Sequence, residues 1–198
     1  SDDTFTFKKA HVLAICREIL ARKLQINWVA ISRVNHVDDE VLCWMRKAGC
    51  TQISYGVESG SKKIRRILNK RLQDGRIKQA FDSTRKYGLL PRAYFIYGSP
   101  GESRQTIQET TALVHDIKPL SVIFYILDIF PGTELYEKFK KEHRVTDDIW
   151  LNRIEDILYF ETDAGLSKEE VLAFGNLLRQ DFYENLPGVI DAVSVIED

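Results

Sequence analysis

The chain has 198 residues, of which 44% are hydrophobic and 29% are charged, so it can bury the core of one domain of ordinary size. Its formal net charge is -1, so no overall positive field draws it toward nucleic acid or anionic lipid. No apolar run approaches the roughly twenty residues that a membrane span requires, and the N-terminus lacks a basic region followed by an apolar one. The sequence therefore predicts a cytoplasmic protein with no membrane partner.

The cysteine and histidine patterns do not indicate a metal site within the chain. The three cysteines are odd in number and form no C-x-x-C pair, so neither a disulfide framework nor a metal knuckle is expected. We expect Cys16, Cys43 and Cys50 to be small buried residues of a reduced protein. The four histidines lack ligand spacing as well.

The first part of the chain alternates helix and strand patterns. Residues 1–6 look like the end of a strand and its turn, and apolar residues spaced three and four apart between Val12 and Leu24 predict a helix. Residues 26–31 predict a strand. A helix that begins after the N-cap Asp38 follows, and Gly49 ends it.

The same alternation continues to the end of the chain. Further strands are predicted at 51–55, 92–97 and 122–127, and helices at 62–70, 77–87, 107–117 and 134–141, with a last helix that begins at the capping box of Ser167. The apolar run 92–97 is typical of a strand covered on both faces. Consecutive strand–helix units imply parallel strands with right-handed crossovers, in either an open sheet or a barrel.

Polar or glycine-bearing segments follow the predicted strands. They are Asp2-Asp3, Ser32-Arg33, Gly56-Val57-Glu58-Ser59-Gly60, Gly98-Ser99-Pro100-Gly101-Glu102 and 128–133. Because the carboxyl ends of parallel strands share one edge, these segments would surround a single ligand site, with Glu58 at its centre. Acids at several of these ends suit a ligand rich in hydroxyl and amine donors, and no Walker or dinucleotide fingerprint is present. Alternatively, Glu58 is only a helix N-terminal acid that complements the macrodipole.

In this order, these segments resemble the radical S-adenosylmethionine (radical SAM) enzymes, in particular the branch that often carries an upstream cobalamin-binding domain. Ala48-Gly49-Cys50, Asn69-Lys70 and 131–136 add to the likeness, which covers about residues 1–140. The resemblance implies an α/β fold, a partial (β/α)6 TIM-like barrel truncated at its N-terminal side. It divides the chain into a core at 1–142 and a mostly helical C-terminal extension at 143–198.

The resemblance also implies where S-adenosylmethionine (SAM) binds. Asp2 or Asp3 would contact the methionine amino group, and Glu58 with Ser59 would meet the ribose and methionine portions. The adenine would lie between the turn 98–102 and the backbone of 128–130. The cofactor-binding residues predicted in this way are Asp2, Asp3, Arg33, Glu58, Ser59, Gly98, Pro100, Gly101, Glu102, Asp128 and Phe130.

One departure from the family is decisive for activity. Radical SAM chemistry needs a C-x-x-x-C-x-x-C loop that holds a [4Fe-4S] cluster, and this chain has no such loop. We therefore expect a fragment of a larger enzyme, inactive alone, whose cluster ligands and possible cobalamin domain lie upstream of Ser1. The enzyme would cleave SAM reductively and start methyl transfer or rearrangement on an unknown substrate. An uncovered sheet edge would let the fragment self-associate.

Three other interpretations remain at this point. The chain could be a non-enzymatic βα-barrel binding or interaction domain that lacks the cluster. It could be a barrel of other chemistry with Glu58 and Asp128 as an acid/base pair. The basic residues between Lys62 and Arg71 could bind RNA or phosphate, but they lack the aromatic residues of a nucleic-acid surface, so we do not expect a nucleic-acid partner.

Overall fold

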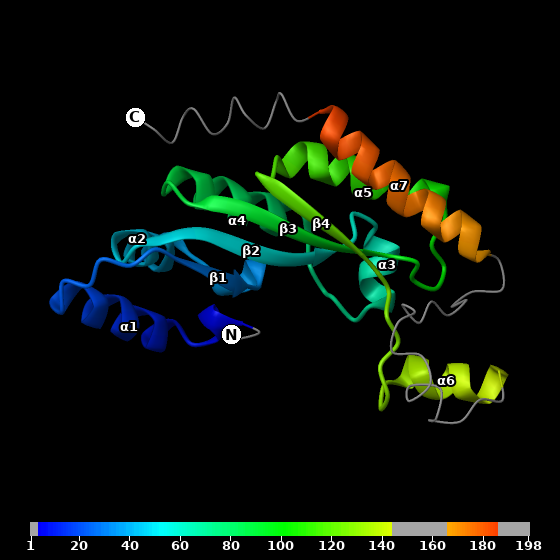
Figure 1. The fold of residues 1–198 in the computed structure, drawn as a ribbon, viewed down its shortest axis with the longest axis horizontal. Helices are drawn as coiled ribbons and strands as arrows, with labels where there is room; N and C mark the ends of the chain where they lie inside the picture. The colour runs from blue at the N-terminus through cyan, green and yellow to red at the C-terminus, as the bar shows by residue number, and fades with distance from the viewer. Residues whose placement is uncertain (1–3, 144–165, 186–198) are drawn as a thin grey trace.

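The computed structural model describes residues 4–143 and 166–185, and Figure 1 shows its fold. Four parallel strands form one sheet in the order β1-β2-β3-β4, with β1 at Trp28–Ser32, β2 at Cys50–Glu58, β3 at Leu90–Tyr97 and β4 at Ser121–Ile126. The helices are α1 (Lys9–Ala21), α2 (Asp39–Lys47), α3 (Lys62–Ile67), α4 (Asp74–Lys86), α5 (Arg104–Ile117), α6 (Glu134–His143) and α7 (Lys168–Glu184). Two 3-10 turns, η1 at Phe5–Phe7 and η2 at Val34–His36, complete the order. The predicted residues Asp2 and Asp3 lie outside the described residues.

The sheet confirms the predicted α/β class. Each strand follows its neighbour in the chain and runs parallel to it, with helical segments in every connection. Such units wind in one hand and place their helices on the same side of a curving sheet. Helices α2, α4 and α7 contact the sheet directly, and α5 packs between α4 and α7. In Figure 1 these helices lie along one side of the strands.

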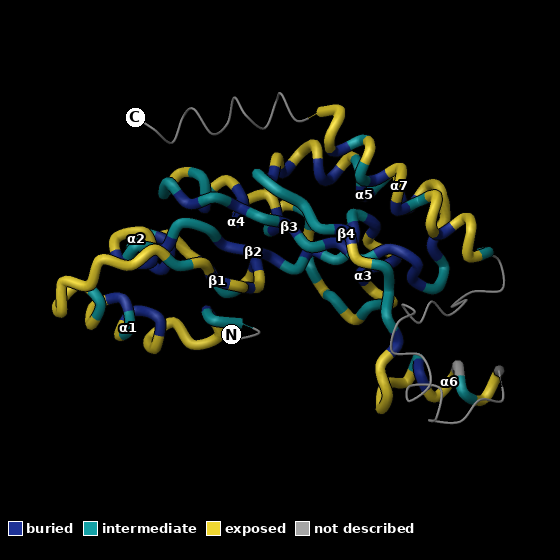
Figure 2. The backbone as a smooth tube through the Cα atoms, viewed as in Figure 1, coloured by how far each residue is buried: buried dark blue, intermediate teal, exposed yellow. Residues whose placement is uncertain are grey.

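The two faces of the sheet differ in burial. In β3 the side chains of Ala93, Phe95 and Tyr97 are buried against helices, whereas Tyr94 and Ile96 between them are half-buried. For the described residues, the expectation that this strand is covered on both faces is therefore wrong, because alternate residues line a cavity and not a second layer of helices. Figure 2 shows burial concentrated along the strands and the inner sides of the helices.

Local signals set several helix ends as expected. The Asp38 side chain accepts a hydrogen bond from the Val41 amide at 2.9 Å, and Ser167 begins α7 with a capping box. The basic helix α3 ends at Ile67 rather than Lys70, because Asn69 takes a left-handed conformation with φ 52°. This early stop leaves Lys70 in the loop that follows α3.

Helix α7 shares the core of the sheet. Its buried residues Val171, Leu178 and Phe182 join the same hydrophobic cluster as the strands. The predicted division of the chain at residue 142 stays a prediction. Within the described residues, no helix is both long enough and apolar enough to cross a membrane.

Candidate functional site

A cavity of about 750 Å³ lies at the carboxyl ends of the strands. That volume is in the usual range for a small-molecule site. Its lining residues come from the ends of all four strands, from the segments that follow them, from α7 and from Thr4 before η1. They are Thr4, Ile31, Ser32, Arg33, Gly56, Glu58, Lys70, Tyr94, Ile96, Tyr97, Phe124, Tyr125, Ile126, Leu127, Asp128, Phe130 and Arg179. A cavity therefore lies at the edge of the sheet where the sequence predicted a ligand site.

Glu58 reaches this cavity through two local distortions of β2. The pairing with β3 shifts register between Gly56 and Glu58, so the strand bulges at its last residues. Glu58 itself has a φ of 72°, which is uncommon for a residue with a side chain. Bulges and left-handed residues cluster where a strand must re-aim a side chain at a functional site.

The Glu58 carboxylate forms an ion pair with a cation that the sequence did not single out as a site residue. Lys70 Nζ lies 2.6 Å from Glu58 Oε1, and the side chains are 23% and 16% exposed. A partly buried pair of this kind is worth more than a surface pair, because water screens it less. The sequence feature that could have indicated Lys70 is Asn69, because asparagine adopts the left-handed conformation more readily than most residues. In the structure Asn69 takes this conformation after the end of α3, and Lys70 then lies beside the end of β2.

Gly56 makes room for this pair. A Cβ at Gly56 would lie 2.6 Å from Glu58 Oε1 and 3.1 Å from Lys70 Nζ. Because Gly56 has no side chain, the Glu58 carboxylate and the Lys70 ammonium can form their ion pair beside it.

Ser59 and Gly60 pack against α5 and do not line the cavity. The fully buried Ser59 hydroxyl lies 3.3 Å from the Thr110 hydroxyl, and the Gly60 amide donates to Thr110 Oγ1 at 3.0 Å. A Cβ at Gly60 would lie 2.3 Å from the Glu109 carbonyl oxygen, so this turn is pressed against the backbone of α5.

The turn after β3 is held by Glu102. This side chain is 5% exposed, and one of its oxygens accepts hydrogen bonds from the amides of Gly98 and Ser99. The other oxygen, Oε1, has no hydrogen-bond partner among the described residues. Burial raises the pKa of the carboxyl to about 7, although the two amide donors act in the opposite direction. Glu102 therefore shapes the turn from inside.

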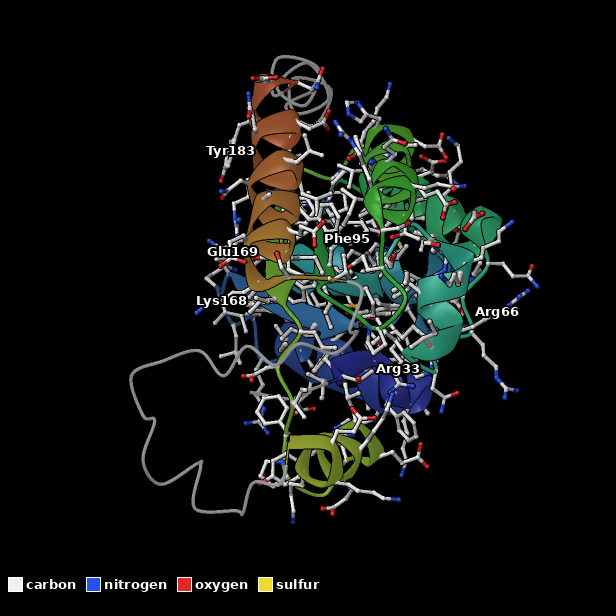
Figure 3. The ribbon with its side chains drawn as sticks, turned by 90° about the vertical axis from the view of Figure 1, so that its right-hand side faces the viewer. Arg33, Arg66, Phe95, Lys168, Glu169 and Tyr183 are labelled. Atoms are coloured by element: carbon white, nitrogen blue, oxygen red, sulfur yellow. The ribbon has the colours of Figure 1, made fainter. Side chains whose placement is uncertain are left out.

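The remaining predicted residues divide by position. Arg33, Asp128 and Phe130 line the cavity with Glu58, whereas the turn of Gly98, Pro100, Gly101 and Glu102 does not. Arg33 is an exposed residue of the rim, and Figure 3 shows Arg66 on α3, projecting outward. Sequence reasoning missed Thr4, the Tyr94–Tyr125 wall and Arg179, because inward strand positions and a distant helix leave no local motif.

The cysteines do not fit an iron–sulfur cluster. Cys16 in α1 and Cys50 at the start of β2 are fully buried, away from the carboxyl rim, and Cys43 lies in α2. Burial raises the pKa of the Cys50 thiol to about 12 and also raises that of Cys16, which opposes the thiolate form that iron requires. Among the described residues, no three His, Cys, Asp or Glu side chains come together to hold a metal.

A partial parallel barrel with a small-molecule cavity at its carboxyl rim defines the class of this chain. The sequence model of the Radical SAM superfamily matches residues 4–114, so the chain belongs to that superfamily. This confirms the resemblance drawn from the motifs.

Two relatives give the range of similarity. The chain is 32% identical over 136 residues to an uncharacterized methyltransferase of Pyrococcus horikoshii, covering 69% of this chain and 30% of the relative. It is 27% identical over 162 residues to the anaerobic magnesium-protoporphyrin IX monomethyl ester cyclase of Cereibacter sphaeroides, covering 80% of this chain and 26% of that protein. The chain thus spans less than a third of either relative.

Two solved structures share the fold. One is TsrM, a radical SAM methyltransferase from Kitasatospora setae with cobalamin and a [4Fe-4S] cluster bound, at TM-score 0.65 and 17% identity over 72% of this chain and 30% of that one. The other is coproporphyrinogen III oxidase from Escherichia coli, at TM-score 0.64 and 18% identity over 90% of this chain and 38% of that one. At these identities the likeness confirms the barrel of the radical SAM type.

Proposed function

We propose that this chain forms the SAM-binding part of a radical SAM enzyme that acts on an organic substrate. The observation that carries the proposal is the Glu58–Lys70 pair, set by a bulge into a cavity at the carboxyl rim of the sheet. Membership of the superfamily makes SAM the expected cofactor. When bound, SAM supplies a sulfonium whose reductive cleavage starts the radical reaction.

The chemistry of the pair suits the methionine and ribose portions of SAM. The Lys70 ammonium can donate to a carboxylate, and the Glu58 carboxylate can accept from an ammonium or from ribose hydroxyls. The adjacent charges of Glu58 and Lys70 are complementary to the ammonium and carboxylate of an amino acid. The pair has no net charge, so ligand binding does not have to desolvate an unbalanced charge. Asp128 adds a second carboxylate to the same cavity, which suits a cofactor of net positive charge.

We propose that the cluster ligands lie outside residues 1–198, since the three cysteines of the chain do not fit a cluster. The similarity to methyltransferases and to a cyclase supports methyl transfer or ring formation on the substrate, with cobalamin as a further cofactor of an upstream domain. The three free thiols fit a protein that works in the reducing cytoplasm.

A second candidate is a binding or interaction domain that has kept the cavity and lost the cluster. The misplaced cysteines are the observation that favours it. The two functions differ in one measurable property, because only the enzyme releases methionine from SAM.

The test is an anaerobic assay of the complete protein after iron and sulfide reconstitution. We expect methionine to be released from SAM when a reductant is supplied, and no release without it. A complete protein that binds SAM but releases no methionine under reduction would support the binding domain and contradict the enzyme.

A further inference from the structure

Arg179 reaches the cavity from α7 and is fixed there by an aromatic ring. Its Nη2 atom donates a hydrogen bond to the Tyr97 hydroxyl at 2.9 Å, and its guanidinium carbon lies 5.5 Å from the centre of the Tyr97 ring. Tyr97 is 3% exposed, so the ring is itself held in place. A cation stacked on a ring in this way loses much of its rotamer freedom.

The contact is built into α7 by a glycine one turn earlier. A Cβ at Gly175 would lie 2.5 to 2.7 Å from three atoms of Tyr97. Glycine inside a helix costs about 1 kcal/mol relative to alanine, so its place here is explained by the approach of the Tyr97 ring. Gly175 and Arg179 are four residues apart and share one side of the helix.

Helix α7, which carries Arg179, packs against α5 and against the sheet. Figure 1 shows α7 beside α5, and the two helices contact each other. His115 Nε2 of α5 lies 2.7 Å from Asp181 Oδ2, and the apolar side of α7 is buried. Figure 3 shows Phe95 in the interior beside α7, with Lys168, Glu169 and Tyr183 on the helix's outer side.

Arg179 has no ionic partner within the described part of the chain, where no carboxylate lies within ion-pair distance of its guanidinium. Its hydrogen bond to Tyr97 uses one of its five N–H donors. Lys70, in contrast, is already paired with Glu58. The Glu58–Lys70 pair is thus neutral overall, whereas Arg179 brings a positive charge into the cavity from α7, and Arg33 and Asp128 line the same cavity.

The cavity that Arg179 lines also has an aromatic wall. The rings of Tyr94 and Tyr125 meet edge to face with their centres 5.9 Å apart, and Phe130 lies exposed on the same rim. Flat apolar groups pack well on such rings. A ligand that uses both the aromatic wall and Arg179 combines an apolar ring with one anionic group.

We propose that Arg179 binds a carboxylate of the substrate while the aromatic wall of Tyr94 and Tyr125 holds its ring. This rests on the proposed function, in which SAM occupies the Glu58–Lys70 end. With the amino-acid group of SAM at the Glu58–Lys70 end, Arg179 is available for an anion of the substrate. The substrate class is then an aromatic carboxylic acid.

The test uses two probes of equal shape, 2-naphthoate and the neutral 2-naphthamide, titrated calorimetrically into the complete protein with SAM present. We expect naphthoate to bind about tenfold tighter than naphthamide, as a charge-assisted pair requires. Arg179→Met should remove that preference by weakening naphthoate alone. Arg22→Met, a change just after the end of α1 at a residue that does not line the cavity, should leave the preference intact.

Several outcomes would overturn the proposal. They are the absence of a preference in the unaltered protein, its persistence in Arg179→Met, or a loss of SAM affinity in Arg179→Met with naphthoate binding unchanged. If Arg179→Met does not fold, Tyr97→Phe keeps the ring and removes the hydrogen bond, and an unaltered preference in that variant would count against Arg179. Failure of the unaltered protein to bind SAM contradicts the proposed function, whereas the naphthoate comparison without SAM still tests Arg179.

Discussion

Lys70 Nζ lies 2.6 Å from Glu58 Oε1, although the two residues belong to different segments separated by the whole of α3. Each group is needed to keep the other from being an unpaired charge in a partly buried place. The bulge of β2, the left-handed backbone of Glu58 and the early end of α3 all serve this one contact. The pair is therefore the centre of the site in this account.

The role of the Glu58–Lys70 pair can be tested by adding a methyl group at Gly56. Gly56→Ala would place a methyl group 2.6 Å from Glu58 Oε1 and so push the pair apart. Because the displaced atoms are ends of flexible side chains, we expect a stability loss of about 1 kcal/mol or less, together with a loss of SAM affinity of about tenfold. Thermal melts and calorimetric titration on the same sample measure both. Unchanged affinity would mean that the pair does not contact SAM.

Substitution of Gly60, unlike that of Gly56, should lower the stability of the protein substantially. A methyl group there meets the backbone of α5, which cannot move aside locally, so Gly60→Ala should cost about 1 to 3 kcal/mol in unfolding free energy. The matched control is Gly75→Ala in α4, where nothing lies within 4 Å and alanine should stabilise the helix by up to about 1 kcal/mol. Urea denaturation measures both changes. Equal stabilities of the two variants would refute the close packing of this turn on α5.

Glu102 predicts a pH dependence of stability. Its pKa is about 7 in the folded protein, against an ordinary value of 4.5, so the folded state holds a proton that the unfolded state has lost between these pH values. The free energy of unfolding should therefore fall as pH rises from 4.5 to 7, by an amount on the order of 3 kcal/mol, and level off above that range.

The neutral amide variant isolates this contribution. Glu102→Gln keeps an acceptor for the Gly98 and Ser99 amides and cannot ionise, so its stability should change less between pH 5 and pH 8 than that of the unaltered protein. Urea denaturation at the two pH values gives the comparison. Parallel pH curves for both proteins would exclude Glu102 as the source.

The cysteines give a prediction about iron. If the cluster ligands lie outside this chain's three cysteines, the combined change Cys16→Ala, Cys43→Ala and Cys50→Ala should leave the iron content of the reconstituted complete protein unchanged. Iron analysis with the visible absorbance of the cluster measures this. A stoichiometric loss of iron would show that at least one of these thiols is a ligand.

The sequence predicted the strands and helices well, because βα units have clear apolar periods and their caps, such as Asp38 and Ser167, are local. It also placed Glu58 at the rim, since a strand end followed by glycine and a helix is a local pattern. The sequence could not predict the features that depend on contacts between residues far apart in the chain. Gly60 meets α5 about fifty residues later in the chain, and Arg179 meets Tyr97 from more than eighty residues away.

The same limit applies to the roles of predicted residues. Ser59 and Glu102 belong to motifs that resemble a cofactor site, yet their side chains are buried in contacts with Thr110 and with the turn's own amides. A motif identifies a segment of backbone, whereas the burial of each side chain is decided by the elements packed on it. Their part in SAM binding stays a prediction.

The most direct test of the central claim is calorimetric titration of SAM into the complete protein and its Glu58→Gln variant, each with a thermal melt. The amide keeps the shape of the side chain and removes its charge and its ion pair with Lys70. We predict that SAM binding weakens by about 1.5 to 3 kcal/mol, roughly ten- to hundredfold, while the variant remains folded. Unaltered SAM affinity in a folded Glu58→Gln protein would contradict the account, because Glu58 would then be a structural residue at the end of β2.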